Sequence, residues 1–203
     1  MEKVKCIEYR GIRDVVAAEV IADTTEAFEC GEPFSMLWAS QLSRETENSS
    51  ESHYYDNVPA IVIDSTGADT VTVEGSAIPL DVYAKITGQL YDEEVGMLVE
   101  GERDSKYYAL GYVTEDTDGE EVFVWRLKGK FGIPSETHAT KNAGTDANGQ
   151  SVTFTGVSTT HKFAKRGKSE RAVNVKKSLC PMDEAEFFAS VQTPDTVKAN
   201  TGV

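Results

Sequence analysis

The sequence predicts a mostly β fold with one flanking α-helix and long polar loops. Polar and apolar residues alternate with a period of two in several segments, most clearly in TVTVE at 70–74, and this pattern is typical of a strand with one buried face. Directly after it, apolar residues recur at helical spacing from Leu80 to Leu90, with Pro79 in the first turn and Gly88 near the end, which predicts a short amphipathic helix. A lone helix on a β-rich body must pack its apolar stripe on a sheet face or over the open end of a barrel.

Size and charge limit the classes of protein to consider. The 203 residues fit one domain, 1–203, that is long enough to bury a substantial core. The formal net charge is −14. So acidic a surface argues against a protein that wraps nucleic acid, because such proteins need cations to displace the counterions of the phosphates. It does not exclude a surface that nucleic acid slides past.

Cysteine usage and hydropathy indicate a soluble protein folded in a reducing cytoplasm. Cys6, Cys30 and Cys180 are odd in number, far apart and in no CxxC pair, so we expect free thiols rather than a disulfide framework. No apolar run approaches the length needed to span a bilayer, and the first residues lack the hydrophobic core of a signal peptide. We therefore expect neither membrane binding nor export by the general secretory route.

The first part of the chain combines strand-forming and polar segments. Weak β patterns at 4–9 and 15–21 lead to a stretch at 34–42 that is apolar at most alternate positions. Residues 43–52 contain no apolar anchor, so the segment 43–56 is expected to be a mobile loop unless a partner orders it. The alternative is an arm that folds against a neighbouring subunit. Its candidate contact residues are Arg44, Glu45, Glu47, Tyr54, Tyr55 and Asp56.

The middle of the chain contains the clearest hairpin. After a turn expected at 64–69 and the helix, the β-rich segments 107–113 and 121–127 flank a polar stretch with an Asp-Gly pair at 118–119. That pair is a strong turn signal. Gly111 inside the first of these strands indicates a bulge or the close approach of another backbone.

The last part combines flexible polar segments with one basic stretch. Residues 135–150 predict a flexible loop, 151–160 a strand and 193–203 an unpacked tail. The stretch 161–177 is basic in an acidic chain, and it is either a solvated hairpin loop or a patch that meets an acidic surface on another copy. Its candidate contact residues are Lys162, Lys165, Arg166 and Lys168. A last short helix is expected at 181–191.

No residue pattern indicates catalysis, a cofactor or a metal. The histidines at 53, 138 and 161 lie in or beside predicted loops, without metal-ligand spacing to a cysteine or another histidine. Adjacent acidic pairs such as 93–94 point to opposite faces of a strand, so they cannot converge on one substrate. The chain also lacks a glycine-rich phosphate loop and a GxSxG elbow. We expect a non-enzymatic protein without a cofactor, with weak calcium binding at 64–74 as the remaining alternative.

Five motifs, taken in order, are similar to a known family. They are YYDNVPA at 54–60, DTVTVEGSAIPLDVYAKITG at 69–88, YYALGYV at 107–113, FVWRLKGKFGIPS at 123–135 and TFTG at 153–156. Each motif is structural and weakly specific alone, but the ordered set resembles the major tail tube protein of long-tailed, siphovirus-type phages and related prophages. The resemblance covers about half of the chain, from Tyr54 to about Gly156.

The resemblance implies a β-sandwich or barrel-like subunit with a helix on its flank. Copies would form homohexameric rings whose strands join into one inner β-barrel, and stacked rings would form the tube through which genomic DNA leaves the capsid. In this family the long loop before the central strands commonly reaches the adjacent ring, which maps here onto 43–56. An acidic lumen would repel phosphate, so that the duplex passes without specific binding.

The resemblance also implies partners and a location. The partners would be other copies of the chain, a tail tip or baseplate initiator, a tape-measure protein and a tail terminator. The location would be the virion tail, after synthesis and assembly in the cytoplasm of the host bacterium.

Two alternative functions follow from similar folds. The first is a β-sandwich module that binds carbohydrate or a receptor on a particle surface, which would need an exposed aromatic platform. Trp38 and Trp125 are the candidates, but both lie in alternating strands and are expected in the core. The second is the inner-tube protein of a contractile injection system, which shares the architecture of a tail tube.

Overall fold

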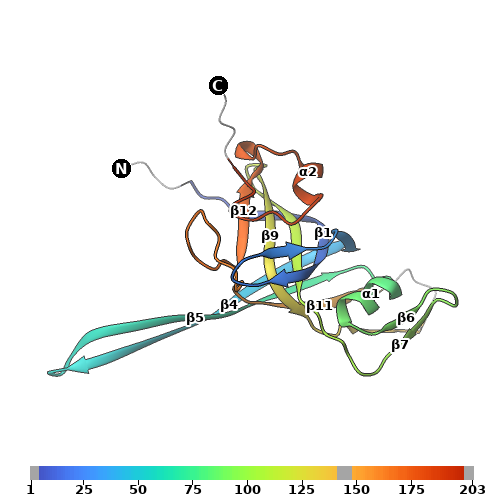
Figure 1. The fold of residues 1–203 in the computed structure, drawn as a ribbon, viewed down its shortest axis with the longest axis horizontal. Coiled ribbons are helices and arrows are strands. Elements are labelled where there is room, and N and C mark those ends of the chain that lie inside the picture. The colour runs from blue at the N-terminus through green and yellow to red at the C-terminus, as the bar shows by residue number, and fades with distance from the viewer. Residues whose placement is uncertain (1–4, 141–147, 199–203) are drawn as a thin grey trace.

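The structure is a computed structural model that describes residues 5–140 and 148–198 (Figure 1). As the sequence predicts, the described residues are mostly β, with a large antiparallel sheet, a small two-stranded sheet and two α-helices. The strands are β1 (Tyr9–Asp23), β2 (Phe28–Cys30), β3 (Phe34–Leu37), β4 (Ala39–Tyr55), β5 (Val58–Gly75), β6 (Leu90–Asp92), β7 (Met97–Val99), β8 (Tyr108–Asp116), β9 (Glu121–Phe131), β10 (Ser135–Glu136), β11 (Gln150–Gly156) and β12 (Ala172–Lys176). The helical elements are α1 (Leu80–Thr87), the 3-10 turn η1 (Lys177–Leu179) and α2 (Glu184–Phe188).

The large sheet is curved, so that the side that contains β1 lies near the side that contains β4. Neighbouring strands are hydrogen-bonded in the order β2-β1-β8-β9-β11-β5-β4. In addition, β3 pairs with β1, β10 pairs with β11 and β12 pairs with β9. β3 pairs with β1 and β4 pairs with β5, yet only Trp38 separates β3 from β4. The carbonyl of Trp38 accepts a hydrogen bond of 2.9 Å from the backbone N–H of Ser76, which follows β5. This single residue therefore links the β1 side of the sheet to the β5 side.

The helix α1 packs into the main core of the molecule. That core combines strand residues such as Val71 and Phe154 with Tyr83 and Ile86 of α1, all of them buried. The helix ends at Gly88, whose φ of 70° lies in the left-handed region that glycine adopts without strain. The predicted helix is therefore confirmed, together with the residue at which it ends.

A second buried cluster lies on the opposite face of β8 and β9. Phe123 and Trp125 are fully buried there together with Phe163 and Phe187. The indole N–H of Trp125 donates a hydrogen bond of 3.3 Å to the carbonyl of Phe187 in α2. The expected core position of Trp125 is confirmed, and β8 and β9 are covered on both faces.

β8 and β9 form the hairpin that the sequence predicts. Gly119 in its turn has a φ of 82°, which favours glycine. A Cβ atom at Gly111 would lie 2.8 Å from Val16 Cγ2 and 2.9 Å from Trp125 Cζ3. The close neighbours of Gly111 are therefore side chains and not another backbone as expected, while the bulge that was the other expectation lies in the facing strand β1, whose register shifts between Arg13 and Val16.

The segment 43–56, expected as a mobile loop, is instead a paired strand and the start of its turn. β4 and β5 pair out to Tyr55 opposite Val58. The two residues between them, Asp56 and Asn57, have φ values of 50° and 64°, and both central residues of a type I′ hairpin turn need positive φ. The expectation failed because a strand exposed on both faces needs no apolar residues, and its backbone bonds are made to β5.

Other segments also differ from the sequence-based expectations. Residues 64–69, expected as a turn, lie inside β5. Within the flexible loop expected at 135–150, Ser135–Glu136 forms β10 against β11, while 141–147 lies outside the described residues. The last helix ends at Phe188, short of the expected residue 191. At 64–69 and 135–136, a local composition typical of loops is overridden by pairing with another strand.

The expected unpacked tail at 193–203 is packed as far as residue 198, where the described part ends. Thr193 is buried. The carboxylate of Asp195 accepts hydrogen bonds from the backbone N–H groups of Ala164 at 2.8 Å and Lys165 at 2.9 Å. This part of the chain therefore holds another loop in place.

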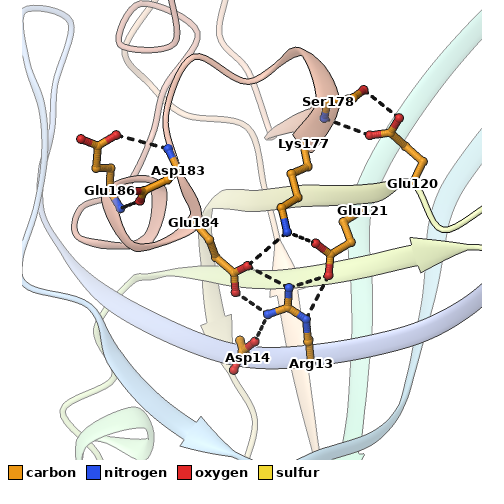
Figure 2. A network of polar contacts seen from close by, with 9 residues as sticks. All are labelled: Arg13, Asp14, Glu120, Glu121, Lys177, Ser178, Asp183, Glu184 and Glu186. Carbon is orange, nitrogen blue, oxygen red and sulfur yellow. Dashed lines mark hydrogen bonds and ion pairs between the residues drawn. The ribbon is translucent and has the colours of Figure 1, made fainter.

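An ion network attaches the C-terminal elements to the sheet (Figure 2). Arg13 of β1 donates to Glu121 of β9 at 2.6 Å and to Glu184 of α2 at 2.8 Å, and it also contacts Asp14. Lys177 of η1 donates to Glu121. The bond from Lys177, followed by that from Arg13, holds the pKa of Glu121 below its usual value. None of the described helices is long and apolar enough to cross a membrane.

Candidate assembly surfaces

The most prominent surface is a projecting hairpin, which we call the arm. It comprises residues 47–68, the part of β4 and β5 beyond the opposed pair Thr46 and Asp69, and it extends away from the body of the molecule (Figure 1). Its residues are exposed apart from the half-buried His53 and Ala68. At ~3.3 Å per residue the arm is about 30 Å long.

Buried charges fix the root of the arm. Arg126 of β9 donates to the carboxylate of Asp69 at 2.8 Å, and the hydroxyl of Thr46 donates to the same carboxylate at 2.6 Å. Arg171 approaches Asp69 to 3.5 Å and donates to the carbonyl of Thr66 at 2.9 Å. Because β5 is bonded to the body at this point and β4 is bonded to β5, the direction in which the arm leaves the body is defined.

Four large apolar side chains lie on one face near the tip of the arm, and we call it the apolar face. Opposed residues of a hairpin share a face. Tyr55 is opposite Val58, and beyond a register shift next to Tyr54 the same face carries Ile61 and Ile63 with their partners His53 and Glu51. Each of the four is between 48% and 61% exposed. A two-stranded hairpin is marginally stable alone in water, and contiguous exposed apolar surface marks interaction sites. The apolar face is therefore the strongest candidate for a contact with another molecule.

The arm is also strongly acidic. Between residues 47 and 68 there is no lysine or arginine. The acidic residues of the arm are Glu47, Glu51, Asp56 and Asp64. Its partner must therefore tolerate or neutralise negative charge.

The contact residues predicted within 43–56 are spread along the hairpin. Arg44 and Glu45 lie below the arm, opposite Val71 and Thr70 of the body. Glu47 is the first residue of the arm. The residues that the structure brings together at the tip are Tyr54, Tyr55 and Asp56.

The contact residues predicted in the basic stretch form a separate surface on the body, the basic loop (residues 161–168). Phe163 anchors this loop in the second buried cluster, and it pairs with Lys168 across a turn. Asp195 holds the backbone of the loop from the other side, and Arg166 forms an ion pair of 3.3 Å with Glu170. The four predicted cations are exposed: Lys162, Lys165, Arg166 and Lys168. The predicted solvated hairpin loop is thus a well-anchored turn.

A groove between β1 and β4 was not predicted from the sequence. It has a volume of about 900 Å³ and opens between the first residues of the two strands, with β8, β9 and β12 beneath it. Its walls and floor include Tyr9, Arg10, Ile12, Ala39, Gln41, Leu42, Arg44, Tyr112, Val122, Val124 and Arg126. The groove exists because β3 occupies the edge of β1 only at residues 15–17. No local sequence signal reports such a gap, since it depends on where a distant strand stops pairing.

The aromatic platform needed for the alternative carbohydrate- or receptor-binding function is present in part. Trp38, expected in the core, is 88% exposed. Its backbone is used in the link to Ser76, which leaves the indole outside the core. The expectation for Trp38 was wrong because this residue lies between β3 and β4. The alternation of polar and apolar residues does not predict where a side chain points when the strand is interrupted.

The described residues contain no group of three or more histidine, cysteine, aspartate or glutamate side chains that could hold a metal ion. Cys6, Cys30 and Cys180 are free thiols, as expected. Burial, together with the charge of Asp23, raises the pKa of the Cys30 thiol to about 12. Cys30 is therefore a poor nucleophile at neutral pH.

No protein-family model matches the chain, and comparison with the curated proteins finds no match. A proposal for the function must therefore be argued from the arm, the basic loop and the groove.

Proposed function

We propose that this chain is a structural subunit that polymerises into a phage tail tube. Its copies would form hexameric rings that stack into the conduit for ejected genomic DNA, as the resemblance of its motifs implies. The observation that supports this most is the arm, which is rooted by buried charges and ends in an exposed apolar face. Soluble monomers rarely expose such a face, whereas a polymer subunit needs one.

Free strand edges support the same proposal. Among the described residues, β4 pairs with β5 alone, and the part of β5 in the arm pairs with β4 alone. Long unpaired edges are templates for pairing with other chains. Strands from neighbouring copies would complete these edges, so that assembly provides the protection that an isolated sheet must otherwise build for itself.

The acidic balance suits a conduit for DNA. A lumen rich in carboxylates repels the phosphates of the duplex and releases no counterions on contact. The net charge of −14 therefore favours passage over retention. The exposed cations of the basic loop are gathered in one place, where contacts between subunits would neutralise them.

Negative-stain electron microscopy of the purified full chain at high concentration tests the proposal. We expect hollow tubes of constant diameter built from stacked rings, because only the polymer covers the apolar face of every arm. The same tubes should bind no added duplex DNA in a gel-shift assay. Monodisperse single copies at all concentrations and ionic strengths would contradict the proposal.

The exposure of Trp38 favours a second candidate function, binding of carbohydrate or a receptor. Tyr9, which lines the groove, is also strongly exposed at 81%, and aromatic faces stack on the apolar faces of sugars. Screening the full chain on a glycan array tests this function. Binding that Trp38→Ala abolishes would support it, and the absence of any bound glycan would reject the carbohydrate form.

A further inference from the structure

The groove between β1 and β4 has two unpaired strand edges as its walls. From Tyr9 to Asp14, β1 pairs only with β8, and from Ala39 onward β4 pairs only with β5, among the residues that the structure describes. Each wall therefore offers backbone N–H and C=O groups to an extended segment laid beside it. The volume of about 900 Å³ lies within the range of about 300–1,000 Å³ of binding sites for ligands.

The floor of the groove contains an apolar strip beside polar residues such as Thr114 and Arg126. Tyr112 and Val124 are buried core residues that line it, and Ile12, Leu42 and Val122 pack partly buried against the same core. An extended segment directs alternate side chains to one side. A segment with apolar residues at alternate positions therefore matches this strip, whereas a uniformly polar segment would not.

The charged residues of the groove are all cations. Arg10, Arg44 and Arg126 line it, and no aspartate or glutamate does, although the whole chain has a net charge of −14. Arg10 lies 4.0 Å from Glu115, and Arg44 has no ion-pair partner among the described residues. Because Arg126 is already paired with the buried Asp69, the positive charge that favours an acidic occupant comes from Arg10 and Arg44.

One polar atom at the floor is left without a partner. Arg126 is 5% exposed, and its two terminal nitrogens bond to Asp69 and Tyr112. Its Nε is buried and has no hydrogen-bond partner among the described residues. An unmade hydrogen bond on a buried charged group is costly, and because this atom is buried an acceptor reaches it only when the side chains around it move.

We propose that the groove receives the arm of a neighbouring copy of this chain. The arm combines the features that the groove selects: free strand edges, acidic residues without a lysine or arginine, and Ile61 and Ile63 at alternate positions on one face. Its length of about 30 Å lets it reach beyond its own subunit. This inference rests on the proposed function and adds the place on the neighbour where the arm binds.

An arm that inserts into a groove makes a head-to-tail contact. The two surfaces are different parts of the same chain, so a bound pair of copies still has one free arm and one free groove. Contacts of this type generate closed rings or open filaments, and not isolated dimers. The growth of a polymer from identical subunits follows directly from this geometry.

Photo-crosslinking between differently labelled copies tests the inference. A benzophenone amino acid replaces the exposed groove residue Gln41 in unlabelled full chain, which is then mixed with ¹⁵N-labelled chain under assembly conditions and irradiated. We expect crosslinks from position 41 to ¹⁵N-labelled peptides of residues 47–68. The same amino acid at Leu179, which is exposed but lies outside the groove, should give no arm crosslinks.

A charge reversal tests the electrostatic part. Arg44→Glu in the chain that carries the crosslinker should reduce the yield of arm crosslinks by about fivefold, because one attraction becomes a repulsion. Lys198→Glu makes the same charge change at an exposed residue outside both the groove and the basic loop and should leave the yield unchanged. Equal yields in both variants would overturn the role of the cationic walls.

The outcomes separate the inference from the proposed function. Tubes whose position-41 crosslinks map to other segments, or do not form, overturn the groove as the binding site and leave the tail-tube function standing. Arm crosslinks without tubes support the groove and contradict the function. The absence of both tubes and crosslinks overturns both.

Discussion

At the scale of single residues, Asp69 decides where the body ends and the arm begins. Its carboxylate is bonded to Arg126, Thr46 and Arg171, which belong to three different parts of the chain. Asp69 and Arg126 are both buried. A buried charge pair contributes little net stability, but removal of one partner leaves the other charge uncompensated.

We expect Asp69→Asn to lower the free energy of unfolding by about 3 kcal/mol, because Arg126 then stays buried without a counterion. Urea denaturation followed by tryptophan fluorescence measures the change. Asp64→Asn is the matched control on the exposed arm and should stay within about 0.5 kcal/mol of the natural chain. Equal stability of the two variants would show that the root does not depend on this pair.

Asp23 is a second residue on which several elements converge. It joins the end of β1 to Lys128 of β9 at 2.5 Å and to the backbone N–H groups of Thr160 and His161. Burial raises the pKa of Asp23, but these donors outweigh burial and the net pKa is below its ordinary value. The ionised carboxylate is therefore the form that the folded protein prefers.

The lowered pKa of Asp23 determines how the stability of the protein depends on pH. A carboxylate whose pKa is lower in the folded state stabilises the fold above its unfolded pKa of about 4, and this contribution is lost as the pH falls through the folded value. We expect Asp23→Asn to destabilise the chain at pH 7 and to have a much smaller effect near pH 3. Urea unfolding at both values tests this, with the exposed Glu26→Gln as control. If Asp23→Asn lowered the free energy of unfolding as much near pH 3 as at pH 7, the lowered pKa of Asp23 would be contradicted.

At the scale of elements, the arm separates assembly from folding. Its apolar face is exposed in the subunit, so polar substitutions there remove no contact within the body. We expect Ile61→Ser with Ile63→Ser to change the free energy of unfolding by less than about 0.5 kcal/mol while abolishing tubes in electron micrographs. Val62→Ser, on the opposite face of the hairpin, is the matched control and should assemble.

Elements with local signals were predicted, and elements defined by distant pairing were not. Pro79 and Gly88 bound α1 by local backbone geometry, and the Asp-Gly pair at 118–119 sets the β8–β9 turn, so both were predicted correctly. β4 was missed because its serines and glutamates resemble a loop. The signal that could have found it is the Asp-Asn pair at 56–57, which suits positive φ between two strand-forming residues.

The candidate surfaces, too, were predicted only where the local sequence carries a signal. The residues at the tip of the arm were predicted as candidate contacts within the segment 43–56, although this segment was expected to be a loop. The groove was not predictable, because it exists only where β3 stops pairing with β1 and leaves an edge open. The packed C-terminal part was missed for a related reason, since Asp195 binds a loop that is about thirty residues distant in the chain.

At the scale of the whole molecule, one subunit carries complementary surfaces in different places. The acidic arm with its apolar face projects from the body, while the cationic groove with the apolar strip on its floor lies between β1 and β4. Within 5–140 and 148–198, no other part of the subunit covers either surface. A repeated head-to-tail contact between identical copies would cover both surfaces, so the polymer that we propose would follow from the shape and charge of the single chain.

Sedimentation velocity on two versions of the chain tests this most directly. In the shortened version, a two-residue Asn-Gly turn replaces residues 47–68 between the opposed pair Thr46 and Asp69, which preserves the root. We expect the full chain to form progressively larger species as its concentration rises, while the shortened chain, with unchanged circular dichroism, sediments as a single copy throughout. Identical, concentration-independent sedimentation of both chains would contradict the claim that the arm drives assembly.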